Sequence, residues 1–298
     1  MNKNYKELSF EDKKNIVEYY YNNKNKSFNE ISNELKVSER SVSRVLKEFG
    51  INTRLKNRYT LYENYFDIID TQEKAYILGF IYADGFIGDI KYNNIVIAVN
   101  DKQILDEIAH EFKFTGNIRR TKKGGFENSK EGYCINFSSK IMANRLREIG
   151  LYPNKSLTIS NIPNINTDLI RHFIRGYFDG DGSILLSHNT SYHKVNGNIK
   201  KYVYPTYKFD ILGTKDFLED IKSKANFTYA KIQDTRTEEI KCLTICAKKE
   251  FEYIFNYLYE DSTIKLIRKF EKWNYIRSAF VERSTKKIGW IAGKTLEP

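Results

Sequence analysis

The sequence predicts an α+β protein made of two copies of one αββαββα unit, preceded by a small all-α domain. Three observations predict this class. A ten-residue pattern ending in Asp-Gly occurs twice, and the residues that follow it are also repeated. After each copy, stretches rich in β-branched and aromatic residues alternate with stretches of helical periodicity. The first fifty or so residues show helical periodicity only.

Residues 1–52 are predicted to form a helix-turn-helix domain. Apolar residues recur at helical spacing from Phe28 to Leu35 and again from Val42, and an earlier helix is expected at about Phe10 to Tyr21. Ser38 stands where an N-cap belongs, so the second helix of the motif begins near Glu39. The segment resembles the helix-turn-helix units of resolvases and many repressors, although Lys36 occupies the turn position that usually carries Gly. The residues expected to reach a DNA major groove are Ser38, Glu39, Arg40, Ser41, Ser43 and Arg44.

A plain three-helix domain that contacts other proteins is the alternative for this segment. Residues 53–70 follow it as a basic linker, in which Arg54, Lys56 and Arg58 are expected to contact phosphates. The net charge of the chain is +11 and its pI about 9.2, which favours a polyanion as partner. Nucleic acid is therefore the first expectation.

Composition argues against several other classes. No run approaches the roughly 18 apolar residues of a membrane span, so no membrane partner is expected. Three scattered cysteines are too few for a disulfide framework and lack the partners of a zinc site, which indicates a reducing intracellular compartment. That compartment would be the cytoplasm if the gene is bacterial or carried by a phage.

The repeat defines the rest of the chain. Tyr76–Gly85 recurs as Phe173–Gly182, and Val99–Ile108 is echoed by Leu212–Ile221. The second copy is longer after its Asp-Gly, and the extra residues, including 187–198, are expected in an extended hairpin or loop. The expected boundaries are 71–166 for the first repeat, 167–284 for the second and 285–298 for a C-terminal tail.

The two pattern helices carry small residues four apart on one face, which allows close packing of their backbones. These helix-packing residues are Gly79, Ala83, Gly176 and Gly180. Such packing would bring Asp84 and Asp181 together at two helix C-termini, where carbonyl groups are unpaired. Oxygen ligands without thiol or imidazole favour Mg²⁺, with Mn²⁺ as a substitute, and suit metal-dependent phosphodiester hydrolysis. An ordinary pair of core helices is the alternative.

Ile77–Gly85 and Ile174–Gly182 resemble the signature of LAGLIDADG homing endonucleases of the double-motif type. The resemblance covers roughly residues 60–280 and implies that Asp84 and Asp181 bind the metals, together with the C-terminal backbone at Ala83 and Gly180. Asp179 matches Tyr82 of the first copy, so no metal role is expected for it. The family places basic residues beside the metals, and aligning the repeats nominates Lys155 and Lys265 as catalytic.

The resemblance also implies two antiparallel sheets that form a saddle over double-stranded DNA. A monomer with internal pseudo-two-fold symmetry would cut a long asymmetric site and spread its own intron, intein or free-standing gene. Strand residues expected at the DNA are Lys91, Asn93, Arg119, Thr121, Lys123, Lys208, Lys231 and Arg236. The alternatives are a non-cleaving transcription regulator of the same fold and a group I intron maturase.

Overall fold

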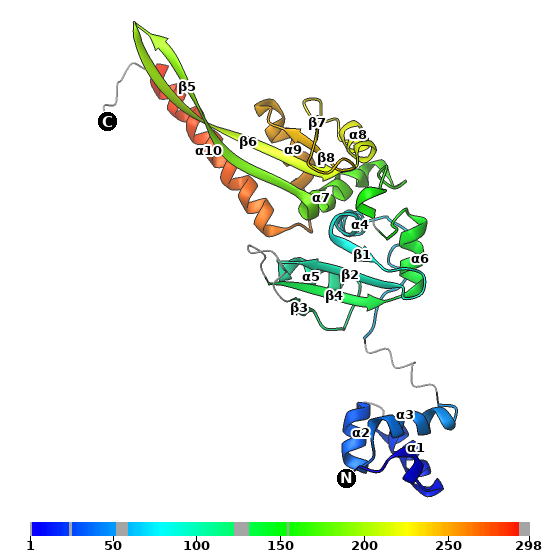
Figure 1. Ribbon diagram of the computed structural model, residues 1–298. Helices are drawn as coiled ribbons and strands as arrows, with labels where there is room; N and C mark the ends of the chain where they lie inside the picture. The colour runs from blue at the N-terminus through cyan, green and yellow to red at the C-terminus, as the bar shows by residue number, and fades with distance from the viewer. Residues whose placement is uncertain (1, 24–25, 52–58, 122–130, 154, 292–298) are drawn as a thin grey trace. The chain divides into compact units, whose positions relative to one another are not determined.

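The computed structural model describes residues 2–23, 26–51, 59–121, 131–153 and 155–291, the last eleven by their backbone alone. The chain divides into two compact units, residues 1–59 and residues 60–298 (Figure 1). Within the described residues, the helices are too short or too polar to cross a membrane.

The first unit is a bundle of three helices: α1 (Phe10–Asn22), α2 (Phe28–Leu35) and α3 (Glu39–Glu48). The hydroxyl of a serine accepts a backbone hydrogen bond at the start of each helix, and Ser38 caps α3 as expected from the sequence. Lys36 ends α2 in the left-handed conformation, with φ 53°, at the position where a Gly would be unstrained. The bundle has a core of its own, formed by Leu8, Ile16, Tyr20, Ile31, Val37, Val42, Val45 and Leu46.

The second unit contains both predicted repeats. The first repeat comprises α4 (Gln72–Asp84), β1 (Gly85–Ile87), β2 (Asn94–Val99), α5 (Lys102–Glu111), β3 (Arg119–Thr121), β4 (Gly132–Ser138) and α6 (Lys140–Glu148). The second comprises α7 (Ile170–Asp181), β5 (Gly182–Val195), β6 (Asn198–Gly213), α8 (Lys215–Lys224), β7 (Lys231–Asp234), β8 (Lys241–Ile245) and α9 (Lys248–Tyr259). Their antiparallel sheets have the equivalent orders β1-β2-β4-β3 and β5-β6-β8-β7. The predicted fold class is thereby confirmed.

Two elements of the second repeat extend beyond the αββαββα plan. β5 and β6 form a long hairpin with fourteen paired positions, whereas β1 pairs with β2 at three. α10 (Ile267–Ile291) follows α9 and runs beside this hairpin (Figure 1). The C-terminal tail was predicted to begin at residue 285, but α10 continues to Ile291, so that boundary falls inside a helix.

Residues 60–70, which we predicted within the linker, pack onto the first repeat instead. Tyr65 and Phe66 are buried, and the Tyr65 hydroxyl donates to Glu111 of α5 at 2.8 Å. The backbone N–H of Thr60 donates to the Thr115 hydroxyl at 2.8 Å. Two aromatic side chains in this short segment outweigh its polar residues, because their burial removes a large apolar area from water.

Each sheet has one face covered by helices and one open face. In β2, Ile95 and Ile97 are buried and alternate with the more accessible Val96 and Ala98. The same alternation in β6 buries Phe209 and Ile211 and leaves Asp210 between them on the open face. Both pattern helices, α4 and α7, lie between the two sheets (Figure 1).

Candidate active site

The helices α4 and α7 pack with their backbones in direct contact. A Cβ added at Gly79 would collide with the backbone carbonyl of Phe173, and one added at Gly176 would collide with that of Tyr76. The two contacts are equivalent under exchange of the repeats. Since only glycine leaves room for a carbonyl oxygen at these positions, the sequence pattern fixes how closely the helices approach.

This packing brings Asp84 and Asp181 to one place. Each is the last residue of its helix, and Gly85 and Gly182 begin the first strand of each sheet directly afterwards. A Cβ on Gly180 would lie 3.3 Å from the Asp84 carboxylate. The two carboxylates therefore lie where the pattern helices end and the two sheets begin.

Electrostatics at this point disfavour two negative charges. Burial and the Asp181 charge raise the pKa of Asp84 to about 6. The Asp181 side chain is accessible to solvent, but the surrounding protein still raises its pKa above the usual range by desolvation. Nearby lysines act in the opposite direction on both carboxyl groups. A cation bound at this point would relieve the repulsion.

Two buried lysines supply positive charge beside the carboxylates. The Lys155 ammonium donates to the carbonyl of Ala83 at 2.5 Å. Lys269, in the first turn of α10, donates to the carbonyls of Phe178 at 2.6 Å, Gly180 at 3.2 Å and Gly182 at 2.5 Å. Ala83 and Gly180 each precede the acidic residue of their repeat, so the two lysines occupy equivalent positions. Burial lowers the pKa of Lys155, and it lowers that of Lys269 to about 8.

Lys269, rather than the predicted Lys265, therefore corresponds to Lys155. The Lys265 amine donates to the carbonyl of Ser262 at 2.8 Å and lies over the Phe270 ring. Lys265 follows α9 at nearly the distance at which Lys155 follows α6, which explains the choice made from sequence. In the first repeat Lys155 begins the short 3-10 helix Lys155–Leu157, whereas in the second repeat the long helix α10 carries the lysine that reaches the site.

The donor set fits Mg²⁺ or Mn²⁺. It consists of two carboxylates and the main-chain carbonyls of Ala83 and Gly180, without a thiol or imidazole. Each of these carbonyls accepts a hydrogen bond from a lysine ammonium. Within the described residues, no group of three or more His, Cys, Asp and Glu side chains is arranged to hold a metal. Magnesium commonly binds through one or two carboxylates and completes its shell with water and substrate phosphates.

Comparison with known proteins supports the fold. No protein-family model matches the chain. An uncharacterized protein of Methanocaldococcus jannaschii is 25% identical over 163 residues, covering 51% of this chain and 57% of that protein, a little over half its length. The structure of the I-LtrWI LAGLIDADG homing endonuclease bound to target DNA has a TM-score of 0.51 at 17% identity, covering 75% of this chain and 92% of that one. The chain has the LAGLIDADG fold.

A further LAGLIDADG homing endonuclease, I-SmaMI bound to cleaved DNA, has a TM-score of 0.49 at 15% identity and covers 74% of this chain and 92% of its own. Within the LAGLIDADG fold, strand register places the sheet residues nominated from sequence. Arg119, Thr121, Lys208 and Lys231 lie on the open faces, because their strand partners alternate with buried residues. Arg236 is exposed after β7, and Lys123 lies outside the described residues.

Lys91 and Asn93 were predicted on a strand, but they lie in the turn between β1 and β2. Asn93 has φ 48°, and its side chain donates to the Ile90 carbonyl and accepts from Arg147 at 2.9 Å. Its polar atoms thus stabilise the turn.

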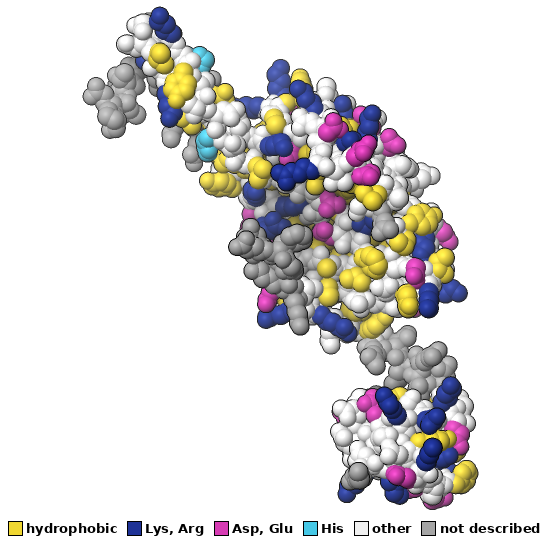
Figure 2. Space-filling model, viewed as in Figure 1, with side chains coloured by type: hydrophobic (Ala, Val, Ile, Leu, Met, Phe, Trp, Pro, Cys, Tyr) yellow, Lys and Arg dark blue, Asp and Glu magenta, His cyan; other side chains and the backbone are white. Residues whose placement is uncertain are grey.

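Figure 2 shows Lys and Arg side chains spread over the visible face of the second unit, including the far part of the β5–β6 hairpin.

The helix-turn-helix candidates divide by burial. Glu39, Arg40, Ser43 and Arg44 are exposed on α3. Ser41 is buried, with its hydroxyl 2.7 Å from that of the capping Ser38, so both serines stabilise the helix start rather than stand free. Ser41 was nominated because it is polar, yet helical periodicity turns it toward the core. Arg54, Lys56 and Arg58 lie outside the described residues.

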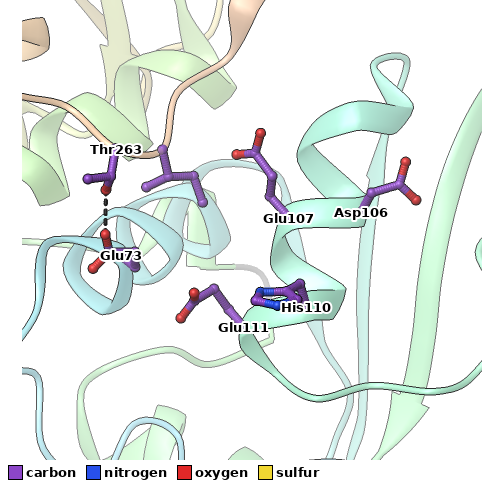
Figure 3. Close-up of a pocket in the computed structure, with 7 residues that line it drawn as sticks. Glu73, Asp106, Glu107, His110, Glu111 and Thr263 are labelled. Atoms are coloured by element: carbon purple, nitrogen blue, oxygen red, sulfur yellow. Dashed lines mark hydrogen bonds between the residues drawn. The ribbon is translucent and has the colours of Figure 1, made fainter.

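Two cavities open beside the pattern helices. One lies next to Asp84 and is lined by both helices, the end of β2 and the start of α10. Arg268, which lines this cavity together with Asp101, pairs with Asp101 at 3.1 Å and connects the two repeats. The other lies between α4, α5 and the loop before α10, where Glu111 extends toward Glu73 and Glu107 toward the loop that carries Thr263 (Figure 3). Because Asp84 of the carboxylate pair lines the first cavity, that cavity is the better candidate for substrate.

Proposed function

We propose that this chain is a site-specific, divalent-metal-dependent endonuclease that cuts both strands of a long, asymmetric DNA site as a monomer. The observation that carries the proposal is the meeting of Asp84 and Asp181, with one buried lysine beside each, at the junction of two sheets with open faces. The solved structure of I-LtrWI, whose fold this chain shares, is a homing endonuclease bound to its target DNA, which supports DNA as the substrate.

Each part of the site has a role in this reaction. Mg²⁺ held by Asp84 and Asp181 would supply positive charge to the scissile phosphate and make a bound water more acidic. Lys155 and Lys269 add fixed positive charge where negative charge develops on the phosphate oxygens. The open sheet faces, with Lys208 and Lys231, would hold the duplex so that one phosphate of each strand reaches the site.

The biological role proposed is homing, in which the protein spreads its own intron, intein or free-standing gene. The two repeats of the chain differ in sequence and in the length of their first hairpins, so one chain would read an asymmetric target. The helix-turn-helix unit, with Arg40 and Arg44 exposed, would add contacts at a separate stretch of the same DNA.

The test starts from binding. The full chain selects duplexes from a randomised DNA pool in Ca²⁺, and the enriched sequence is then incubated with Mg²⁺ or Mn²⁺. We expect double-strand cleavage by the wild-type chain and at least a hundredfold loss in Asp84→Asn and Asp181→Asn with DNA affinity retained. Both variants should stay folded, because a neutral amide removes charge repulsion.

Asp106→Asn is the matched control, since Asp106 is an exposed residue of α5 that pairs with Lys102. Its cleavage should equal that of the wild type. Tight binding without cleavage in either metal would favour the transcription-regulator alternative, and undiminished cleavage by both site variants would reject the assignment of the carboxylates.

A further inference from the structure

Asp179 is a buried acidic residue whose task is separate from that of Asp181. It lies on α7 two residues before the end of the helix, and only 2% of it is exposed. Its carboxyl group accepts three hydrogen bonds, from the Tyr76 hydroxyl at 2.8 Å, the Tyr259 hydroxyl at 2.7 Å and the backbone N–H of Leu266 at 2.8 Å. Burying a carboxyl group costs free energy of desolvation, and the three hydrogen bonds offset this cost only when their donors are held in fixed positions.

The bond to Leu266 fixes the beginning of α10. The carbonyl of Leu266 accepts from the N–H groups of Lys269 and Phe270, so Leu266 is the residue from which the helix starts. Lys269 lies three residues further, in the first helical turn. Any shift of Leu266 therefore moves the Lys269 backbone with it, because a helix turn is stiff.

Arg175 holds the other side of the same loop. It lies one turn before Asp179 on α7, is fully buried, and donates to the carbonyls of Ile264 at 3.1 Å and Leu258 at 3.0 Å. The segment between α9 and α10 is thus attached to α7 at two backbone positions, Ile264 and Leu266, and the end of α9 is attached at Leu258. The helix that ends at Asp181 also determines where the lysine beside Asp181 stands.

In the first repeat, a different side chain holds the segment that carries the lysine. Tyr82 occupies the pattern position of Asp179, and its hydroxyl donates to the carbonyl of Ile149 at 2.8 Å. Ile149 directly follows α6, and the segment after it leads to Lys155. In both repeats, the residue two before the acidic ligand holds the segment that brings the lysine.

We propose that Asp179 is a positioning residue for Lys269, as Tyr82 is for Lys155. Cleavage of one strand of the substrate then depends on Asp179, and cleavage of the other strand depends on Tyr82. The proposal rests on the proposed function for its strand-by-strand consequence. Lys269 contacts the carbonyl before Asp181 and Lys155 the carbonyl before Asp84. Under the pseudo-two-fold symmetry, each lysine serves the phosphate on its own side.

The test measures nicking of each strand of an end-labelled target. Lys269→Met and Lys155→Met first identify which strand depends on which lysine. Asp179→Ala removes the acceptor for Leu266, and we expect it to slow the Lys269-dependent strand at least tenfold more than the other strand. Asp179→Asn keeps one acceptor oxygen and should fall between Asp179→Ala and the wild type. Tyr82→Phe should slow the opposite strand.

Equal slowing of both strands by the Asp179 variants, or no slowing, would overturn the proposal, because a purely structural role has no strand preference. Amide hydrogen exchange in the metal-free protein gives a readout that needs no cleavage. Exchange at 266–270 should be at least tenfold faster in Asp179→Asn than in the wild type and unchanged in Tyr82→Phe. If the wild type does not cut DNA, the proposed function fails, and unchanged exchange would separately reject the positioning role.

Discussion

His172 shows how α7 combines charge and burial close to the helix interface. It is buried, its Nδ1 lies 2.6 Å from Arg175, and its Nε2 accepts from Arg171 at 3.3 Å. Burial and these two guanidinium groups lower the pKa of His172 to about 4, against a smaller opposing effect of Glu73. The folded protein therefore keeps this imidazole neutral at pH values where an unfolded chain would protonate it.

This difference makes stability depend on pH. Because the pKa of the folded state lies below the unfolded value of about 6.5, the contribution of His172 is complete above pH 6.5 and is lost as pH falls toward 4. We expect the free energy of unfolding to fall by about 2 kcal/mol over this pH window. This value follows from roughly 1.4 kcal/mol per pKa unit, reduced for the residual solvent access of the imidazole. Urea denaturation of the wild type and His172→Gln at pH 7 and pH 4.5 measures it.

His172→Gln should show a shallower decline than the wild type, since glutamine stays neutral. His110 lies exposed on α5, so His110→Gln is the control and should follow the wild type. Parallel stability curves for the wild type and His172→Gln would contradict the assignment.

Single residues of the candidate site could be predicted from the sequence where they belong to the repeated pattern. Asp84 and Asp181 were recognisable because each ends a repeated pattern, and the glycines of that pattern place them together. Lys269 was not, since its contact with Gly180 depends on α10, which extends beyond the αββαββα plan that the two repeats share. Ser41 was nominated for its polar side chain, although helical spacing from Val45 places it on the buried face of α3.

At the level of elements, the two first hairpins of the repeats differ in length and charge. β1 and β2 pair at three positions, whereas β5 and β6 pair at fourteen. Residues 182–209 contain four lysines and two histidines and no Asp or Glu. The longer hairpin thus offers a polyanion a basic strand pair that the first repeat does not match. The sequence predicted extra length here, but the continuous pairing that makes it a hairpin depends on contacts between distant residues.

We therefore expect an asymmetric footprint on the target. Replacing His188–Pro205 with an Asn-Gly turn keeps the pairing of Ser187 with Thr206 and removes the far part of the hairpin. At about 3.3 Å per residue, the eight removed positions of β5 span roughly 26 Å, or about 8 base pairs. Hydroxyl-radical footprinting should show protection shortened by up to that length at one end only, and an unchanged footprint would contradict this assignment.

The order of helices and strands was the part of the architecture most accessible from sequence. The patterns predicted helices near Phe10–Tyr21 and from Glu39, and the structure has α1 over Phe10–Asn22 and α3 over Glu39–Glu48. The buried Tyr65 and Phe66 were assigned to a linker, because a short aromatic segment has no periodicity of its own. Such segments acquire structure from the surface they cover.

The whole molecule consists of a small helical unit and a larger unit that contains the candidate active site. The helical unit has its own core, with Ile31, Val42 and Leu46 fully buried. The second unit begins at Thr60, whose backbone is already bonded to Thr115. Since the carboxylates and lysines of the candidate active site all belong to the second unit, the proposed cleavage and the added DNA contacts should be separable by removing residues 1–59.

We expect the 60–298 chain to cut the selected target at saturating concentration within about twofold of the full-length rate, because its site is complete. Its Kd should rise about 10- to 100-fold at 150 mM salt, and the slope of log K against log salt should fall by about three, as about 0.9 is lost for each phosphate contact. Arg40→Gln in the full chain is the matched control, since Arg40 is exposed on α3, and should lower the slope by about one. Fluorescence anisotropy across a salt series measures both the Kd and the slope. An unchanged affinity after the deletion would mean that α3 does not contact the DNA, because any lost phosphate contact weakens binding.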